Sequence, residues 1–145
     1  MRKKICNIDL ELVPIEEDGF HLMVNAKIGR KKIRLLVDTG ASKSVFDKNR
    51  ITAITENSVF ENMEQLSTGL GTSTMQSQMT EIKSIKIGCI EIKNSPVVIL
   101  DLSHVNESYE MIGDKGIDGV LGSDFLEFHK AVIYYNKPRL KLYYW

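Results

Sequence analysis

The sequence predicts an all-β, or at least β-rich, domain, and three observations support this class. Apolar and polar residues alternate over long stretches, which is the pattern of a strand with one buried face. One short run, Leu35-Leu36-Val37, is apolar on both faces, as expected in the interior of a sheet. Turn signals recur at short intervals, which is typical of strands of ordinary length in a sandwich or barrel.

The first third of the chain contains the clearest strand patterns. Ile8, Leu10 and Leu12 alternate with acidic residues, and the alternation becomes cleaner from Phe20 to Ile28. Residues 29–31, Gly-Arg-Lys, form a predicted turn, and the next strand runs from Ile33 to Val37.

The middle of the chain predicts one helix and several strands. Residues 44–66 are the one substantial stretch with loose helical spacing, and Ser44 is a candidate N-cap. The polar, glycine-containing segment 67–74 predicts the tip of a hairpin. Isoleucines from residue 82 to residue 92 predict two strands joined by a tight turn at Gly88-Cys89, and Pro96 is expected to start a further strand over residues 97–100.

The last third predicts short elements. Residues 103–115 are polar and rich in turn formers, so we expect a surface loop there. The chain then predicts a strand over 117–121, a short helix over 123–129, a strand over 131–135, a turn at 136–138 and a final strand over 140–145.

Composition limits the possible functions. The chain has 145 residues, of which 43% are hydrophobic and 26% are charged, so we expect a single domain over residues 1–145, with residues 1–19 as an N-terminal extension strand. With 19 basic and 19 acidic residues the formal charge is zero, which argues against a nucleic-acid partner. No stretch approaches the roughly 20 apolar residues of a membrane span, so we expect no membrane partner and a cytoplasmic location.

The cysteines and histidines suggest no metal or redox chemistry. Cys6 and Cys89 are far apart and form no Cys-x-x-Cys pair, so we interpret both as buried or idle thiols in a reducing compartment. The three histidines have no ligand-like spacing, and we expect neither a metal nor a cofactor.

The strongest chemical signal is the segment Leu35-Leu36-Val37-Asp38-Thr39-Gly40-Ala41. An acidic residue here leaves an apolar strand and enters a tight turn, which would hold its carboxylate at the edge of a core. An aspartate before a glycine is also a common structural turn residue, and Asp-Thr-Gly could occur by accident in an unrelated small barrel. The surrounding sequence favours a chemical role.

With its surroundings, this segment resembles the retropepsin-like aspartic proteases, in which an apolar strand delivers Asp-Thr-Gly-Ala and a later apolar-apolar-Gly element crosses beneath it. The second element matches Val120, Leu121 and Gly122, followed by a short helix and a terminal hairpin as in the family. Gly69, Leu70, Gly71 and Thr72 match a glycine-containing flap, although no aromatic residue stands at the tip. The resemblance extends from about residue 20 to residue 145 and implies a retropepsin-like acid protease barrel with a flap hairpin and one or two short helices.

The resemblance implies an aspartic endopeptidase in which Asp38 is catalytic. Thr39 would join the hydrogen bonds that hold two active-site loops together, and Gly40 would let the backbone of an extended peptide or unfolded protein approach closely. Asp18-Gly19 and Asp118-Gly119 lack the intervening Thr or Ser, so the chain has a single motif and the second carboxylate would come from a homodimer. The aromatic end Tyr143-Tyr144-Trp145 fits such an interface.

Asp118 is expected to start a turn, and Asp124 to lie in the first turn of the short helix. The alternative function is a peptide-binding or assembly module on the same fold that does not cut its ligand.

Overall fold

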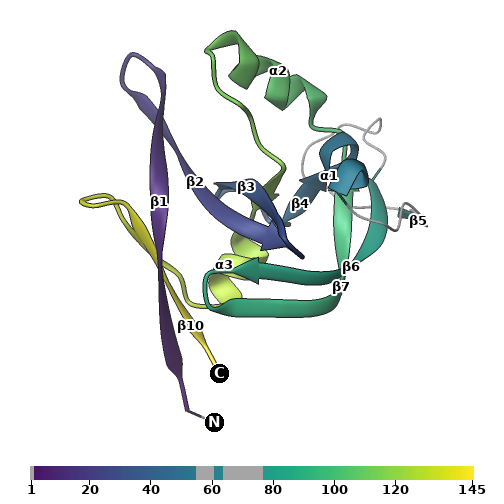
Figure 1. Cartoon of the computed structure of the whole chain (residues 1–145). Helices are drawn as coiled ribbons and strands as arrows, with labels where there is room; N and C mark the ends of the chain where they lie inside the picture. The colour runs from purple at the N-terminus through teal and green to yellow at the C-terminus, as the bar shows by residue number, and fades with distance from the viewer. Residues whose placement is uncertain (1, 55–60, 64–76) are drawn as a thin grey trace.

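The computed structural model describes residues 2–54, 61–63 and 77–145 (Figure 1). In chain order the strands and helices are β1 (Lys4–Glu16), β2 (Gly19–Ile28), β3 (Lys31–Val37), β4 (Val45–Asp47), α1 (Lys48–Ile54), β5 (Glu61–Met63), β6 (Ser77–Ile87), β7 (Ile90–Leu100), α2 (Ser103–Met111), β8 (Gly119–Leu121), α3 (Ser123–Phe128), β9 (Val132–Tyr134) and β10 (Arg139–Tyr144). Strands dominate, so the predicted β-rich class is confirmed.

Six of these strands close into a barrel in the order β2-β3-β8-β4-β7-β6. The ring closes because β6 pairs with β7 along most of its length and also with β2, through Lys27 with Lys86 and Ile28 with Ile85. Two pairings are parallel, β3 with β8 and β4 with β7, whereas β4 and β8 are antiparallel. The short strands β4 and β8 therefore lie side by side in the barrel wall, with β8 next to β3 and β4 next to β7.

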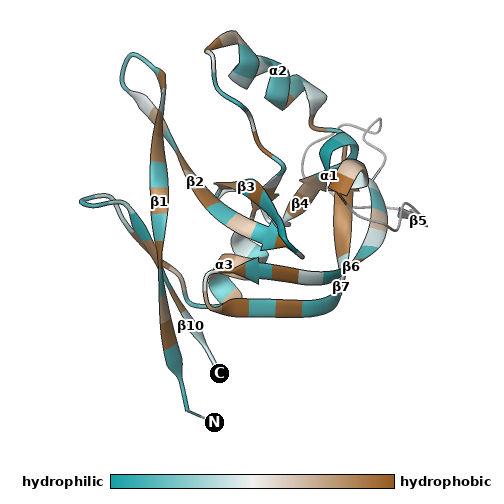
Figure 2. Ribbon diagram, viewed as in Figure 1, coloured by the Kyte–Doolittle hydropathy of each residue, from teal (hydrophilic) through white to brown (hydrophobic). Residues whose placement is uncertain are grey.

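Alternation of side chains sorts the apolar residues into two clusters. Ile33, Leu35 and Val37 of β3 belong to the larger cluster, which fills the barrel. Leu36 points the other way and packs against a smaller cluster built around Met23, Val45, Leu102, Tyr109 and Ile117. Figure 2 shows the alternation of hydrophobic and hydrophilic residues along β1 and β7. The period-two pattern of the sequence therefore has its expected physical cause.

The two ends of the chain form a ribbon beside the barrel. The first half of β1 pairs with β10, from Lys4 with Tyr144 to Asp9 with Arg139, and its second half pairs with β2. Figure 1 shows β1 and β10 side by side, with both termini at the lower end of this ribbon. The predicted short helix, the strand after it and the final strand are confirmed as α3, β9 and β10. In the described residues, no helix is long and apolar enough to cross a membrane.

The prediction of a helix over residues 44–66 is wrong for half of the residues in that range that the structure describes. Residues 45–47 form β4, the helix is confined to Lys48–Ile54, and residues 61–63 form β5. Ser44 is not the N-cap. Asp47 has that role, since its Oδ2 accepts the backbone N–H of Arg50 at 3.1 Å, and its Oδ1 accepts the N–H of Leu102 at 2.9 Å.

The prediction of a surface loop over residues 103–115 is also wrong, because Ser103–Met111 is the helix α2. Most residues of α2 are hydrophilic, as Figure 2 shows, so this segment lacks the apolar spacing that would predict a helix. Its anchors are Leu102 just before it and Tyr109 within it, both buried in the smaller cluster. Tertiary packing of these two side chains therefore stabilises a helix whose sequence has little apolar periodicity of its own.

Pro96 does not start a new strand. It lies inside β7 opposite Glu81, in a ladder that runs from Gln78 with Ile99 to Ile87 with Ile90. A proline interrupts pairing only where its missing N–H is needed by the partner strand. The predicted pair of strands joined at Gly88-Cys89 is confirmed as β6 and β7.

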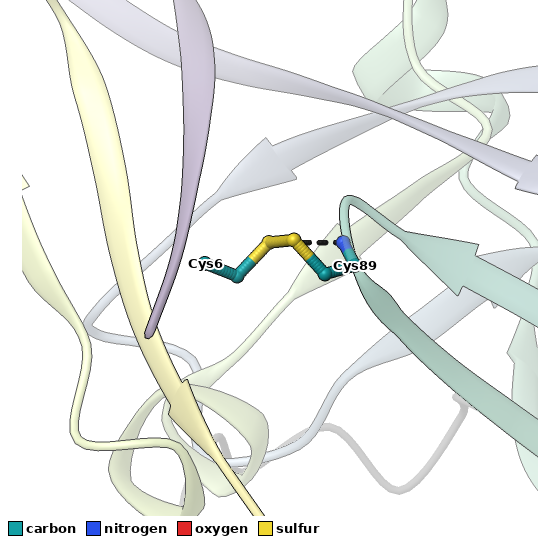
Figure 3. The surroundings of a disulfide bond; sticks show 2 residues. All are labelled: Cys6 and Cys89. Atoms are coloured by element: carbon teal, nitrogen blue, oxygen red, sulfur yellow. Dashed lines mark hydrogen bonds between the residues drawn. A yellow bond between two sulfur atoms is a disulfide. The ribbon is translucent and has the colours of Figure 1, made fainter. Parts of the chain in front are cut away.

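The interpretation of the cysteines as free thiols is wrong, because Cys6 of β1 and Cys89 in the β6–β7 turn form a disulfide (Figure 3). Their Cα atoms are 5.8 Å apart, within the usual range, although 83 residues separate them in sequence. The fold brings them together because the Gly88 turn packs against β1, where a Cβ on Gly88 would lie 2.6 Å from the Ile8 side chain. The disulfide removes one reason for expecting a reducing compartment. The cytoplasmic location stays a prediction.

Candidate active site

Asp38 lies at the point where β3 leaves the barrel. Its side chain is half-buried, and its carboxylate Oδ1 accepts the backbone N–H of Gly40 at 3.0 Å. The Ala41 N–H donates to the Asp38 carbonyl at 3.1 Å and closes the turn. The carboxylate is therefore held at a defined position by the local backbone, at the edge of the apolar core.

The Val120-Leu121-Gly122 element lies beside this turn. Val120 pairs with Leu36 in the parallel β3–β8 ladder, and the Asp38 N–H donates to the Leu121 carbonyl at 3.0 Å. The Ser123 N–H donates to the Ala41 carbonyl at 2.7 Å, on the other side of the turn. One segment, more than 80 residues after the Asp38 turn in sequence, thus holds this turn from both ends.

Gly122 is required at this crossing for steric reasons. A Cβ there would lie 2.8 Å from the Ala41 carbonyl oxygen and 2.8 Å from the Lys43 carbonyl carbon, distances that side chains do not tolerate against a backbone. Its N–H donates to Ser44 Oγ at 2.8 Å, and this hydroxyl in turn donates to Asp124 Oδ1 at 2.7 Å. The absence of a side chain lets the two loops lie in direct contact.

Asp124 and Asp118 have roles that the sequence only partly indicated. Asp124 lies in the first turn of α3 as expected, but it also accepts the N–H and the hydroxyl of Ser44. Asp118 does more than begin a turn. Its Oδ2 accepts the Arg34 N–H at 2.8 Å, and its Oδ1 lies 3.6 Å from the Arg50 guanidinium.

Thr39 and Gly40 are exposed in the isolated chain. A Cβ on Gly40 would meet one atom within 4 Å, the Asp38 Oδ1 at 3.4 Å, so this glycine is not required by packing within the chain. The roles predicted for both residues involve groups outside the chain and stay predictions. The predicted flap residues 69–72 lie outside the described residues.

Arg34 is a buried charge that sequence reasoning did not identify. It lies on β3 with 4% of its surface exposed, and its guanidinium contacts two carboxylates: Glu11 at 3.0 Å and Asp114 at 2.7 Å. It also donates to the Gly116 carbonyl at 2.9 Å. These bonds lower the pKa of Asp114 and, despite burial, raise the pKa of Arg34, because each charge stabilises the other. The one available signal was a cation in an otherwise apolar stretch, Ile33-Arg34-Leu35.

Tyr109 and His21 form a second pair that the sequence did not reveal. Tyr109 of α2 is buried, and its hydroxyl lies 2.7 Å from Nδ1 of His21 on β2. Burial raises the pKa of Tyr109 to about 12, and the negative charges of Asp114 and Asp38 add to the increase. The phenol ring belongs to the smaller cluster, on the face of β3 that carries Leu36.

Comparison with known proteins agrees with this geometry. Residues 24–125 match the profile of a family described as aspartyl protease. Similar solved structures include a retropepsin-like aspartic protease from Rickettsia conorii, with a TM-score of 0.56, 23% identity, and coverage of 99% of this chain and 95% of that chain.

Two other solved structures are also similar. The retroviral protease-like domain of Ddi1 from Leishmania major has a TM-score of 0.51 and 18% identity, with 79% of this chain and 82% of that chain covered. The EIAV protease in complex with the inhibitor HBY-793 has a TM-score of 0.54 and 17% identity, with 84% and 99% covered. At such identities the likeness concerns the fold alone. No curated protein matches the sequence.

The barrel and the crossing of β8 behind an Asp-Thr-Gly turn define a retropepsin-like aspartic protease fold. The family profile covers more than half of the chain, and the protein therefore belongs to the aspartyl protease family.

Proposed function

We propose that this protein is an aspartic endopeptidase, in which two Asp38 carboxylates, one from each subunit of a homodimer, activate a water that attacks a peptide bond. The observation that carries the proposal is the fixed position of Asp38, with its N–H bonded to Leu121 and its carboxylate half-buried at the end of β3. The family membership supports the same chemistry.

A second subunit is needed because the chain supplies one suitable carboxylate. Asp38 is the single aspartate of the sequence that stands in an Asp-Thr/Ser-Gly motif. The acidic residues around the site have other contacts: Asp114 binds Arg34, and Asp124 binds Ser44. An isologous dimer with its twofold axis at the Asp38 turns would place the exposed Thr39 of each subunit next to the other turn.

The chemistry follows from the proximity of two like charges. Two carboxylates that lie close together cannot both ionise at low cost, so one retains a proton. The ionised carboxylate takes a proton from the water, and the protonated one donates a hydrogen bond to the carbonyl oxygen of the scissile bond. The reaction requires an extended peptide or unfolded protein as substrate and no cofactor.

The test is the Asp38→Asn variant, with Asp9→Asn as the matched control, because Asp9 is an exposed residue of β1. We expect Asp38→Asn to abolish cleavage of a peptide library and to leave the circular dichroism spectrum and the oligomeric state unchanged. Asp9→Asn should cleave like the wild type. Cleavage by Asp38→Asn at the wild-type rate would exclude the proposal. Peptide binding without cleavage by the wild type would instead favour the non-catalytic module on the same fold.

A further inference from the structure

Outside the proposed pair of Asp38 carboxylates, the main polar feature is the hydrogen-bond network around Arg34. Its guanidinium joins three parts of the chain: β3, on which it lies, β1 through Glu11, and the segment 112–118 through Asp114 and the Gly116 carbonyl. The Arg34 backbone continues this connection, because its N–H donates to Asp118 Oδ2 and its carbonyl accepts the Asp118 N–H, both at 2.8 Å. One residue thus contacts both ends of the 114–118 turn.

This network lies on the face of β3 from which the Asp38 carboxylate emerges. Residues 34, 36 and 38 alternate to one side of the strand, while Ile33, Leu35 and Val37 fill the barrel core on the other. Leu36 and Val120, which lie opposite each other in the β3–β8 ladder, are both half-buried members of the smaller cluster on that face. Tyr109 of α2 belongs to the same cluster.

The segment 112–118 lies on this face of β3, with Asp118 opposite Arg34, four residues along the chain from Asp38. It connects α2 to β8, and β8 pairs directly with the strand that delivers Asp38. Its other contacts include Asn106 of α2, which bonds the N–H and the carbonyl of Ile117, and Arg50, which donates to the Lys115 carbonyl. The Asp47 N–H also donates to the Asp118 carbonyl at 2.8 Å. Arg34 is the contact that fixes this segment to β3, the strand that bears Asp38.

We propose that Arg34 is a positioning residue of the peptide cleft, which holds the segment 112–118 as a rigid wall on the face of β3 that carries Leu36 and thereby maintains affinity for an extended peptide. The inference rests on the proposed function, since it assigns a role in substrate binding at the same site. Arg34 itself touches no reacting atom. Its loss therefore affects binding of the peptide more than the chemical step.

The first experiment measures the rigidity of the segment 112–118 directly, and it does not depend on enzymatic activity. Amide hydrogen exchange is compared for the wild type, Arg34→Met and the control Lys32→Met, which removes an exposed cation two residues earlier on β3. In Arg34→Met we expect exchange at Gly116, Ile117 and Asp118 to accelerate by about tenfold or more, with β6 and β7 unchanged. Lys32→Met should match the wild type. Unchanged exchange at 116–118 in Arg34→Met would overturn the proposal.

The second experiment separates binding from catalysis. On a peptide substrate we expect Arg34→Met to raise KM by about tenfold and to keep kcat within about threefold of the wild type. Asp114→Asn, which keeps a polar group of the same shape, should show a smaller increase in KM and serves if Arg34→Met folds poorly. A lower thermal stability with unchanged KM would show that Arg34 is only structural, and the proposal would fail.

A failure of the proposed function can be recognised separately. If the wild type cleaves no peptide, affinity for an extended peptide is measured by calorimetry in Asp38→Asn with and without Arg34→Met. Weaker binding in the double variant supports the role of Arg34 even though the enzymatic proposal has failed. Equal affinity, or no binding by either variant, would overturn the role of Arg34.

Discussion

The backbone N–H of Asp38 donates a hydrogen bond of 3.0 Å to the carbonyl of Leu121, so the β8 segment holds the Asp-Thr-Gly turn although 83 residues separate the two. This bond continues the parallel pairing in which Val37 lies opposite Leu121. The position of the Asp38 carboxylate therefore depends on how closely these two segments pack. Gly122 lies at the point where their backbones approach each other most closely.

Substitution of Gly122 by alanine should disrupt this contact. The new Cβ would clash with the backbone of Ala41 and Lys43, which cannot move without displacing the Asp38 turn. We expect a loss of about 1–3 kcal/mol in the free energy of unfolding, measured with urea, and a lower kcat. Gly19→Ala is the control, because a Cβ at Gly19 meets nothing within 4 Å. Equal stability of Gly122→Ala and Gly19→Ala would contradict the steric argument.

Activity should require the dimer. Each chain supplies one Asp38, so specific activity should fall as the protein is diluted below the dissociation constant of the dimer. The measurement combines peptide cleavage with sedimentation at the same concentrations. A monomer in sedimentation that retains full specific activity would refute the shared dyad.

A hydroxyl at position 41 should change the pH profile. Ala41 follows the Asp38 turn, and a serine there could donate a hydrogen bond to the active-site carboxylate. Such a bond stabilises the charged form and lowers the apparent pKa values of the dyad. In Ala41→Ser we expect the acidic limb of kcat/KM against pH to move to lower pH. Superimposable profiles for the two proteins would remove this explanation.

The disulfide should contribute to stability. It closes a loop between residues separated by 83 positions, and such cross-links typically contribute about 2–4 kcal/mol by restricting the unfolded chain. The double variant Cys6→Ser/Cys89→Ser should lose about this much in urea unfolding. Wild-type protein treated with a dithiol reductant provides the matched control and should lose a similar amount. Unchanged stability of the reduced wild type would show that the bond adds nothing.

Acid should weaken the contact between Asp114 and Arg34. The pKa of Asp114 is lower in the folded chain than in the unfolded one, so its contribution to stability is present at neutral pH and is lost as the pH falls through the folded value. The stability difference between the protein and its Asp114→Asn variant should therefore be largest at neutral pH and shrink below about pH 4. Urea unfolding across this range, in an Asp38→Asn background to prevent self-digestion, provides the measurement. A difference that is constant with pH would contradict the assignment.

Local patterns predicted those parts of the fold that depend on neighbouring residues. Alternation over residues 20–28 and 33–37 predicted β2 and β3, because a half-buried strand needs a period of two. The motif at Asp38 and the later Val120-Leu121-Gly122, through their resemblance to a family, predicted which two segments meet. The pattern failed at α2, whose nine residues are largely hydrophilic and whose anchors Leu102 and Tyr109 acquire a partner surface only after folding.

The sequence by itself therefore determined the β-rich class, the longer barrel strands β2, β3, β6 and β7, and the aspartate at the end of β3, since each is recorded in spacing along the chain. Only the tertiary structure decided the pairing of Cys6 with Cys89, the network of Arg34 and the contact of Tyr109 with His21. Each of these joins residues that lie far apart in sequence, from 23 positions for Glu11 and Arg34 to 88 for His21 and Tyr109. No local pattern specifies such a distance, because it is set by how the strands curve and close into the barrel.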